Sequence, residues 1–381
     1  MGALRVEPRR ALSTRAATAV FNVFDVQLVL YALLLAVIGL LMAYTNSAGS
    51  PLSAGATFAR GLMWLALAIL AFTLTAAVDY RWLKTFAWPV YLVNLGLLLV
   101  SFQFGSGVSN TSRWVTILGF QFQFSELAKI LMIVVLANFL SGRRAKMRSL
   151  STILGAGLLV LPPLALVLIQ PDLGTSLVFG ALLVGMLFLA GARLRWLAAG
   201  AVAALAAFPV LWTYVLRDYQ KQRLVSFLDP AADPQGSGYQ LLQSQTAVGS
   251  GGLFGKGLTN GTQTQLDFLP VSSTDFVFAT LSEELGFLGG IAVLVIFAAL
   301  IWRILIVGWR SEDPFGLLFA AGLASIVLFQ VLVNVGMVIG IMPITGIPLP
   351  FVTHGGASLV SIAIGLGILE SIAMRQGRPQ W

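Results

Sequence analysis

Long apolar runs separated by polar connections extend over almost the whole chain. A run of about 20 apolar residues is what one α-helix needs to cross a bilayer. We predict ten spans, near residues 25–44, 58–77, 85–103, 125–140, 150–169, 175–191, 197–216, 277–302, 316–341 and 357–374. The pattern therefore predicts an all-α polytopic membrane protein with about ten transmembrane helices.

The composition supports this prediction and excludes an ordinary soluble domain. Of the 381 residues, 58% are hydrophobic and only 10% are charged, and the mean hydropathy is +0.90. We find no cleavable signal peptide before the first apolar run, which we interpret as a permanent anchor. The Ala-rich run 197–208 predicts a helix that can pack closely against its neighbours.

The distribution of basic residues predicts the orientation of the chain. Most of the 23 Lys and Arg residues fall in connections that share one side if the spans alternate. This is the bias of cytoplasmic loops, and it places cytoplasmic tails at 1–24 and 375–381 around one transmembrane domain, 25–374. Topology and anionic lipid thus account for the net charge of +8, and we expect no nucleic-acid partner.

The same orientation places the longer polar segments on the outer side. These segments are 104–124, 170–174, 217–274 and 342–356. The longest is the loop between spans seven and eight, and loops of such length are usually functional or disordered. Its many glycines indicate tight turns and close backbone approach more than a floppy linker.

Absent residue types exclude several kinds of chemistry. The chain has no cysteine, so disulfides and thiol nucleophiles are excluded, and His354 is the only histidine. We interpret His354 as a hydrogen-bonded structural residue. A cofactor is not indicated, although Mg²⁺ or Mn²⁺ could bind through carboxylates, of which Asp275, Asp172 and Glu126 are candidates.

Charged and polar groups near the predicted membrane boundary are candidate functional residues, because such groups are costly there. Glu126 and Lys129 share a helix face and can form a self-neutralising pair, with Ser125 as a candidate N-cap. Asp172, in a Pro-Asp-x-Gly turn, can cap span six or bring a carboxylate to the level of that pair. Each group has a structural interpretation beside the functional one.

Asp275 is the strongest of these candidates. It follows the long Gly-rich loop and Thr274, directly before span eight. One interpretation is an N-cap for that span. The polar loop beside it favours a functional carboxylate instead. Within the loop, Lys256 lacks the spacing of a nucleotide-binding phosphate loop, so we expect it to face an anionic lipid headgroup.

Several motifs resemble the SEDS family of cell-wall polymerases over nearly the whole chain. They include Arg113-Trp114 with FQFSELAK, then QPDLGTS, AVGSGGLFGKGLTNGTQTQLDFLP, STDFVFA, SEELGFLGG and MPITGIPLPFVTHGG. GTQTQLDFLP resembles the RodA branch of cell elongation more than the FtsW branch of division. Five positions depart from the family pattern. These are Phe124 for proline, Val271 for glutamate, Thr353-His354 for Ser-Tyr, and Ala357 for serine.

The resemblance implies a peptidoglycan glycosyltransferase in a bacterial inner membrane. Such proteins polymerise lipid II into β-1,4-linked glycan strands on the outer face, together with a class B penicillin-binding protein and other elongation proteins. Asp275 falls on the family's catalytic aspartate, which implies a general base in an inverting displacement. With Val271 beside it, no second loop acid is expected.

The remaining site residues receive supporting roles from the same resemblance. We expect substrate-binding groups, some of which offset the charge of the departing pyrophosphate, at Arg113, Trp114, Lys129, Arg223 and Lys256, with Lys129 and Arg113 foremost. We expect support of the cavity from Glu126, Gln170, Asp172 and Thr274. Two rival functions stay open from the residues alone: a lipid II flippase, and a non-catalytic scaffold of the cell-wall complex.

Overall fold

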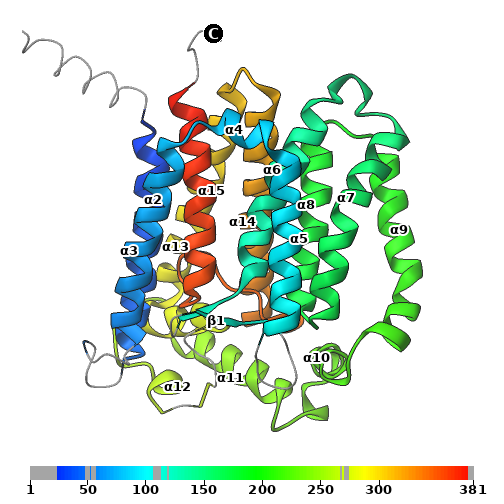
Figure 1. Ribbon diagram of the computed structural model, residues 1–381. Coiled ribbons are helices and arrows are strands. Elements are labelled where there is room, and N and C mark those ends of the chain that lie inside the picture. Colours follow the sequence, from blue (N-terminus) through cyan, green and yellow to red (C-terminus); the bar gives the residue numbers. More distant parts are fainter. Residues whose placement is uncertain are drawn as a thin grey trace, which may run out of the picture.

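The computed structural model describes residues 24–47, 52, 57–105, 113–117, 120–266, 268–269 and 274–375. The predicted tails 1–24 and 375–381 lie outside this part of the chain except for Phe24 and Arg375, and Val271 lies outside it too. The described residues form a helical bundle, and a layer of shorter polar elements covers one of its ends (Figure 1). We call this the polar end.

Each predicted span corresponds to one helix of the bundle, which confirms the fold class. The helices are α2 (Val26–Thr45), α3 (Thr57–Ala77), α5 (Ala87–Phe104), α6 (Phe124–Ser141), α7 (Leu150–Ile169), α8 (Leu173–Leu189), α9 (Leu194–Val210), α13 (Val277–Arg310), α14 (Pro314–Val338) and α15 (Gly356–Met374). Within the described residues, nine are long and apolar enough to cross a membrane, α9 being counted with its continuation to Val215. The tenth, α8, is a shorter apolar helix of 17 residues.

The long loop is more ordered than a chain of turns. It contains α10 (Asp218–Leu228), the 3₁₀ turn η4 (Pro230–Ala232), α11 (Ser237–Ser250) and α12 (Thr262–Gln265). Further short elements are α4 (Tyr80–Thr85), the hairpin β1 (Val115–Ile117) and β2 (Phe120–Phe122), η2 (Arg144–Lys146) and the π-helical turn η3 (Leu211–Val215). In the hairpin, Val115 pairs with Phe122 in antiparallel register.

The core lies around α14, which packs against α6, α8, α13 and α15. Its small residues allow close approach, since a side chain at Gly322 would meet Ile133 of α6 and Met186 of α8. The Ala-rich helix α9 is different. The helix predicted for 197–208 forms, but none of its residues is buried, so its capacity for close packing is not used in this structure. Figure 1 shows α9 at the edge of the bundle.

The segment 339–355 between α14 and α15 has no regular helix, as its prolines predict. Irregular backbone at membrane depth must be buried in protein, where other groups satisfy its hydrogen bonds. Glycines of neighbouring helices make room for it: side chains at Gly39 of α2 and Gly174 of α8 would meet the carbonyl oxygens of Phe351 and Thr345. The segment is therefore enclosed by helices.

The Gly-rich part of the long loop fills a break in α13. Gly286 adopts φ 72° and ψ −172°, which interrupts the helix and frees backbone groups on both sides. The loop pairs with them: Lys256 N–H donates to the Glu283 carbonyl (3.0 Å), and Phe287 N–H donates to the Gly252 carbonyl (2.9 Å). These bonds fix the loop to the helix that follows Asp275.

The break predicts different costs for two glycines of the loop. Gly255 has φ +81°, and an added Cβ would meet the Glu284 carbonyl. We expect Gly255→Ala to lower the free energy of unfolding by about 1–3 kcal/mol or more, because strain adds to a clash. Gly249→Ala is the control, since its Cβ would meet nothing within 4 Å. Thermal unfolding in detergent measures both. Equal melting temperatures of the two variants would contradict the close fit of Gly255 against the break in α13.

Candidate functional site

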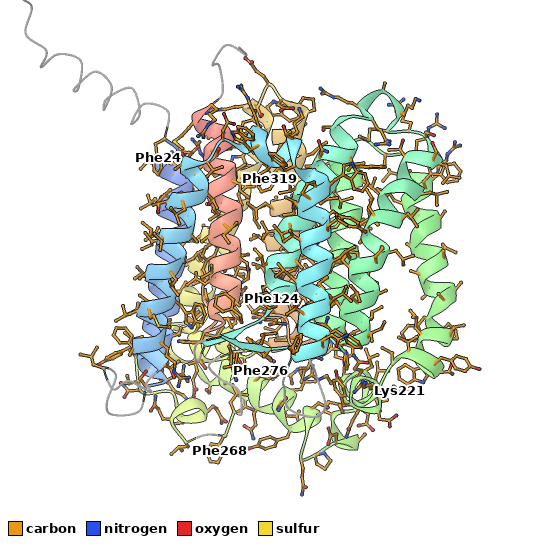
Figure 2. The ribbon with its side chains drawn as sticks, viewed as in Figure 1. Phe24, Phe124, Lys221, Phe268, Phe276 and Phe319 are labelled. Atoms are coloured by element: carbon orange, nitrogen blue, oxygen red, sulfur yellow. The ribbon has the colours of Figure 1, made fainter. Side chains whose placement is uncertain are left out.

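Asp275 lies in a short turn at the polar end of the bundle, directly before α13. Figure 2 shows the neighbouring Phe276 at this end, far from Phe24. Phe276 occupies the N-cap position of α13, and no side chain caps the helix. The N-cap interpretation of Asp275 is therefore wrong. The Asp275 carboxylate therefore does not cap α13.

Two arginines face the Asp275 carboxyl from different parts of the chain. Arg223 comes from α10 and Arg113 from the residues before β1. Asp275 Oδ2 and one terminal nitrogen of Arg223 lie 3.4 and 3.5 Å from the point where a Cβ on Gly346 would stand. A Cβ on Gly346 would therefore be in van der Waals contact with both the Asp275 carboxylate and the Arg223 guanidinium. The φ of +72° at Gly346 also suits glycine.

Burial raises the pKa of the Asp275 carboxyl above its ordinary value. The charges of Arg223 and Arg113 and a hydrogen bond with Thr274 oppose this shift, whereas the nearby Asp172 carboxylate reinforces it. No Lys or Arg nitrogen within the described residues lies within 4.0 Å of the Asp275 oxygens. The carboxyl thus sits near cations without being bound to one.

Arg113, Tyr219 and Arg223 line a small cavity of about 50 Å³, and Asp275 is not among its lining residues. Arg113 donates to the carbonyls of Gln170 and Pro171 and to the Tyr219 hydroxyl. The guanidinium carbon of Arg223 lies 5.8 Å from the centre of the Tyr219 ring. Tyr219 thus organises both arginines. Sequence analysis missed this residue because a tyrosine in a polar loop carries no distinctive pattern.

The turn before α8 carries two buried polar side chains, those of Gln170 and Asp172. Asp172 is buried and caps α8, accepting from Thr175 N–H (3.1 Å), from the Thr175 hydroxyl (2.9 Å) and from Gln123 (3.0 Å). Gln170 is buried as well and donates to the Leu98 carbonyl (2.8 Å). The capping interpretation of Asp172 is confirmed, and its carboxylate also contributes to the electrostatics of Asp275.

Glu126 and Lys129 form the expected pair, with Nζ and Oε1 2.7 Å apart. Both side chains are only 3% exposed. Ser125 is not the N-cap, because α6 already begins at Phe124 behind Gln123. The structure joins Lys129 to Glu126 and joins Asp172 to other partners. The substrate-binding role of Lys129 stays a prediction.

Lys256 is engaged by a different carboxylate. Its Nζ lies 2.7 Å from Glu283 Oε1 and 2.8 Å from the Thr262 hydroxyl. Glu283 also accepts from the backbone N–H of Gln263 (3.1 Å). These contacts join the Gly-rich loop to α13 and do not bring Lys256 to Asp275. Trp114, half-buried, directly precedes β1 beside Arg113.

Two further polar side chains hold the Asp275 turn, and sequence analysis missed both roles. Asn334 of α14 donates to the carbonyl of Asp275 (3.0 Å), and the Thr353 hydroxyl donates to the carbonyl of Thr274 (3.3 Å). Asn334 carried a signal that was available, because it is a polar residue inside a long apolar run.

A divalent cation would find few free ligands here. No three His, Asp or Glu side chains of the described residues converge on one point. The Asp172 oxygens already accept hydrogen bonds, which leaves Asp275 as the main available carboxylate. Mg²⁺ often binds one or two carboxylates together with substrate phosphates, and in that arrangement Asp275 would hold it. The metal would then neutralise phosphate charge.

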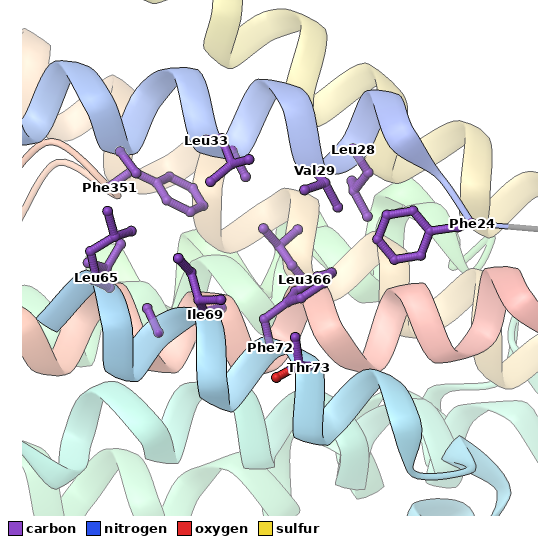
Figure 3. Close-up of a pocket in the computed structure, with 15 residues that line it drawn as sticks. Phe24, Leu28, Val29, Leu33, Leu65, Ile69, Phe72, Thr73, Phe351 and Leu366 are labelled. Carbon is purple, nitrogen blue, oxygen red and sulfur yellow. The ribbon is translucent and has the colours of Figure 1, made fainter. Parts of the chain in front are cut away.

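A larger, apolar cavity of about 280 Å³ lies between α2, α3 and α15. It is lined by Phe24, Leu28, Leu65, Phe72 and Leu366 among others (Figure 3). Its lining has almost no polar atom and contains none of the charged residues described above. The cavity offers room for hydrocarbon and no catalytic group.

Known proteins share both the sequence and the architecture. Residues 26–378 match the family model of the FtsW, RodA and SpoVE cell cycle proteins. Peptidoglycan glycosyltransferase MrdB of Escherichia coli K12 is 39% identical, covering 82% of this chain and 84% of its own. Stage V sporulation protein E of Bacillus subtilis is 37% identical, covering 92% of this chain and 96% of its own.

Two solved structures are similar over 93% of this chain. One belongs to a peptidoglycan synthase complex that coordinates polymerization and crosslinking, with 29% identity, a TM-score of 0.79 and 99% of that chain covered. The other is the rod shape determining protein RodA of Thermus thermophilus, with 27% identity, a TM-score of 0.69 and 98% covered. These similarities confirm the predicted family: the chain belongs to the FtsW/RodA/SpoVE, or SEDS, family of multi-pass membrane proteins.

Proposed function

We propose that this peptidoglycan glycosyltransferase of cell elongation polymerises lipid II, with Asp275 as its general base. The observation that carries the proposal is the placement of Asp275. Its carboxyl is half-buried, caps no helix and lies with the Arg223 guanidinium beside Gly346. An acid beside two cations suits a reaction that moves a proton and releases a pyrophosphate.

The reaction needs one displacement at the anomeric carbon. The acceptor's 4-hydroxyl oxygen attacks this carbon while the bond to the pyrophosphate oxygen breaks, so an α-linked donor becomes a β-1,4 glycoside. The Asp275 carboxylate takes the proton of the hydroxyl. The pyrophosphate leaves with the bonding electron pair. No covalent enzyme intermediate is required.

The electrostatics fit these two demands. A base is most effective when its pKa approaches the working pH, and burial moves the pKa of Asp275 in that direction. Arg113 and Arg223 carry guanidinium groups, which bind phosphate oxygens well, and Arg113 keeps one terminal nitrogen that is not used by the bonds to Gln170, Pro171 and Tyr219. The cavity that both arginines line supports a role for them in holding the leaving pyrophosphate.

The membrane location follows from the two parts of the substrate. A polyprenyl chain is stable in hydrocarbon, whereas the sugars need water, so the reaction belongs at a membrane boundary. We assign the polar end to the outer face of a bacterial inner membrane, because the basic connections lie opposite to it. A similar chain belongs to a peptidoglycan synthase complex that coordinates polymerization and crosslinking, which supports a class B penicillin-binding protein as the crosslinking partner. Other elongation proteins are proposed as further partners.

Removal of the base should separate an enzyme from a transporter. We expect Asp275→Asn to reduce polymerisation of labelled lipid II, by the purified protein with its partner, about 10²–10⁴-fold. Asp218→Asn is the matched control, since Asp218 on α10 is fully exposed. Translocation of lipid II across vesicles is measured in parallel. Intact polymerisation with abolished translocation would overturn the proposal in favour of a flippase, and intact polymerisation with intact translocation would show that Asp275 is not the base.

Removal of the nearest cation should change the pH dependence. The charge of Arg223 lowers the pKa of Asp275, so Arg223→Gln should raise that pKa further. Because the base acts when ionised, the acid limb of the pH–rate profile should move to higher pH. Lys221→Gln on the same helix is the control, because Lys221 pairs only loosely with Asp218 (3.8 Å). An unshifted acid limb in Arg223→Gln would contradict the claim that the Arg223 charge lowers the pKa of the base.

A further inference from the structure

We propose that Asn334 and Thr353 are positioning residues that set the distance between the Asp275 carboxyl and the Arg223 guanidinium. The inference rests on the proposed role of Asp275 as base. It adds two residues, from α14 and from the segment before α15, that would control catalysis without touching the substrate.

The Asp275 turn needs support because no regular secondary structure holds it. Residues 274–276 precede the first helical residue of α13, Val277, and the helix has no side-chain cap. A carboxylate on such a turn would sample several positions. Loss of geometry of about 1 Å at a reacting centre can cost about 10²-fold in rate.

Asn334 supplies one half of the support. Its side chain is fully buried at 0% exposure, and its single amide nitrogen donates to two carbonyls, those of Asp275 (3.0 Å) and Ile347 (2.8 Å). Both hydrogens of the amide are therefore used. One nitrogen atom thus binds two carbonyls that are 72 residues apart in the sequence.

Thr353 supplies the other half. Its side chain is buried, and its hydroxyl donates to the carbonyl of Thr274 (3.3 Å) while it accepts from the backbone N–H of Leu349 (2.8 Å). Consecutive carbonyls, those of Thr274 and Asp275, are thus tied to one stretch of chain. We call the two side chains and their four hydrogen bonds the clasp.

The segment that the clasp holds, around Ile347, also lies beside the Asp275 carboxylate and the Arg223 guanidinium. A Cβ added at Gly346, next to Ile347, would be in van der Waals contact with both Asp275 Oδ2 and Arg223. On the other side of Gly346, Thr345 packs against Gly174 at the start of α8, close to Asp172. The clasp therefore links the Asp275 backbone to the same surface that limits the approach of Arg223. The charged groups facing Asp275 are Arg223 of α10, Arg113 before β1 and Asp172 before α8.

A purely structural role makes a different prediction. If Asn334 only satisfied the Ile347 carbonyl in irregular backbone, its loss would lower stability and leave the chemistry of surviving molecules unchanged. A positioning role changes the chemistry itself. The rate constant falls, substrate binding persists, and the acid limb of the pH–rate profile moves with the changed environment of Asp275.

Thr353 offers the sharper pair of variants. Thr353→Val keeps the shape and removes the hydroxyl, whereas Thr353→Ser keeps the hydroxyl. We expect Thr353→Val to lower kcat for lipid II polymerisation about 10- to 100-fold with an unchanged KM, and to shift the acid limb. Thr353→Ser should restore kcat to within about 2-fold of the original protein, because the same hydrogen bonds can form.

Asn334→Leu tests the second member of the clasp, with Asn94→Leu as its control. Asn94 is equally buried and donates to a backbone carbonyl, that of Ala128 (3.3 Å), but it belongs to α5 and contacts neither the Asp275 turn nor the segment 343–355 through its amide. Both substitutions should lower the melting temperature in detergent. Only Asn334→Leu should also lower kcat and shift the acid limb.

Asp275→Asn, assayed beside these variants, separates the two hypotheses. Activity in Asp275→Asn overturns the proposed base and the clasp together. An inactive Asp275→Asn with original kcat and pH profiles in Asn334→Leu and Thr353→Val overturns the clasp alone. Failure of Thr353→Ser to restore kcat also contradicts it, because shape would then matter more than the hydroxyl.

Discussion

The architecture of the site depends on the irregular segment 339–355 and the need to satisfy its backbone inside a membrane protein. Lipid offers no hydrogen bonds, so such a segment must lie against protein. Gly39 and Gly174 let α2 and α8 approach it, and Asn334 and Thr353 bind its polar groups. Because the same two side chains bind the Asp275 turn, burial of the segment also builds the site.

Among the described residues, the Asp275 carboxylate differs from two buried carboxylates in its distance to cations. Glu126 and Glu283 each meet a lysine at 2.7 Å, which offsets the cost of their burial and commits them to structure. Asp275 instead faces two arginines at longer range within the described residues. The two arginines favour the ionised form of the Asp275 carboxylate, and neither forms an ion pair with it. Asp275 therefore differs from both glutamates in that no lysine or arginine nitrogen of the described residues lies within 4.0 Å of its carboxylate.

The spans could be predicted from the sequence because a bilayer demands long apolar runs, and each predicted run became a helix. Helices α10 and α11 were not predicted, since their polar composition gives no transmembrane signal and the many glycines indicate turns. The small residues of α9 would permit close packing, but none of its residues is buried, because composition permits contact without specifying a neighbour.

Motif resemblance identified Asp275, Arg113 and Arg223 as candidates. Their convergence, the capture of Lys256 by Glu283 and the clasp depend on tertiary contacts between distant segments, which no local pattern encodes.

The central claim, that Asp275 is the base, is tested most directly by titrating its carboxyl and the reaction together. Infrared difference spectroscopy of protein with isotope-labelled aspartate can follow the protonation of one carboxyl, identified by its loss in Asp275→Asn. The account predicts that this signal titrates above the ordinary range of aspartate and that its midpoint coincides with the acid limb of the pH–rate profile for the unliganded enzyme. A carboxyl that titrates well away from that limb would contradict the account.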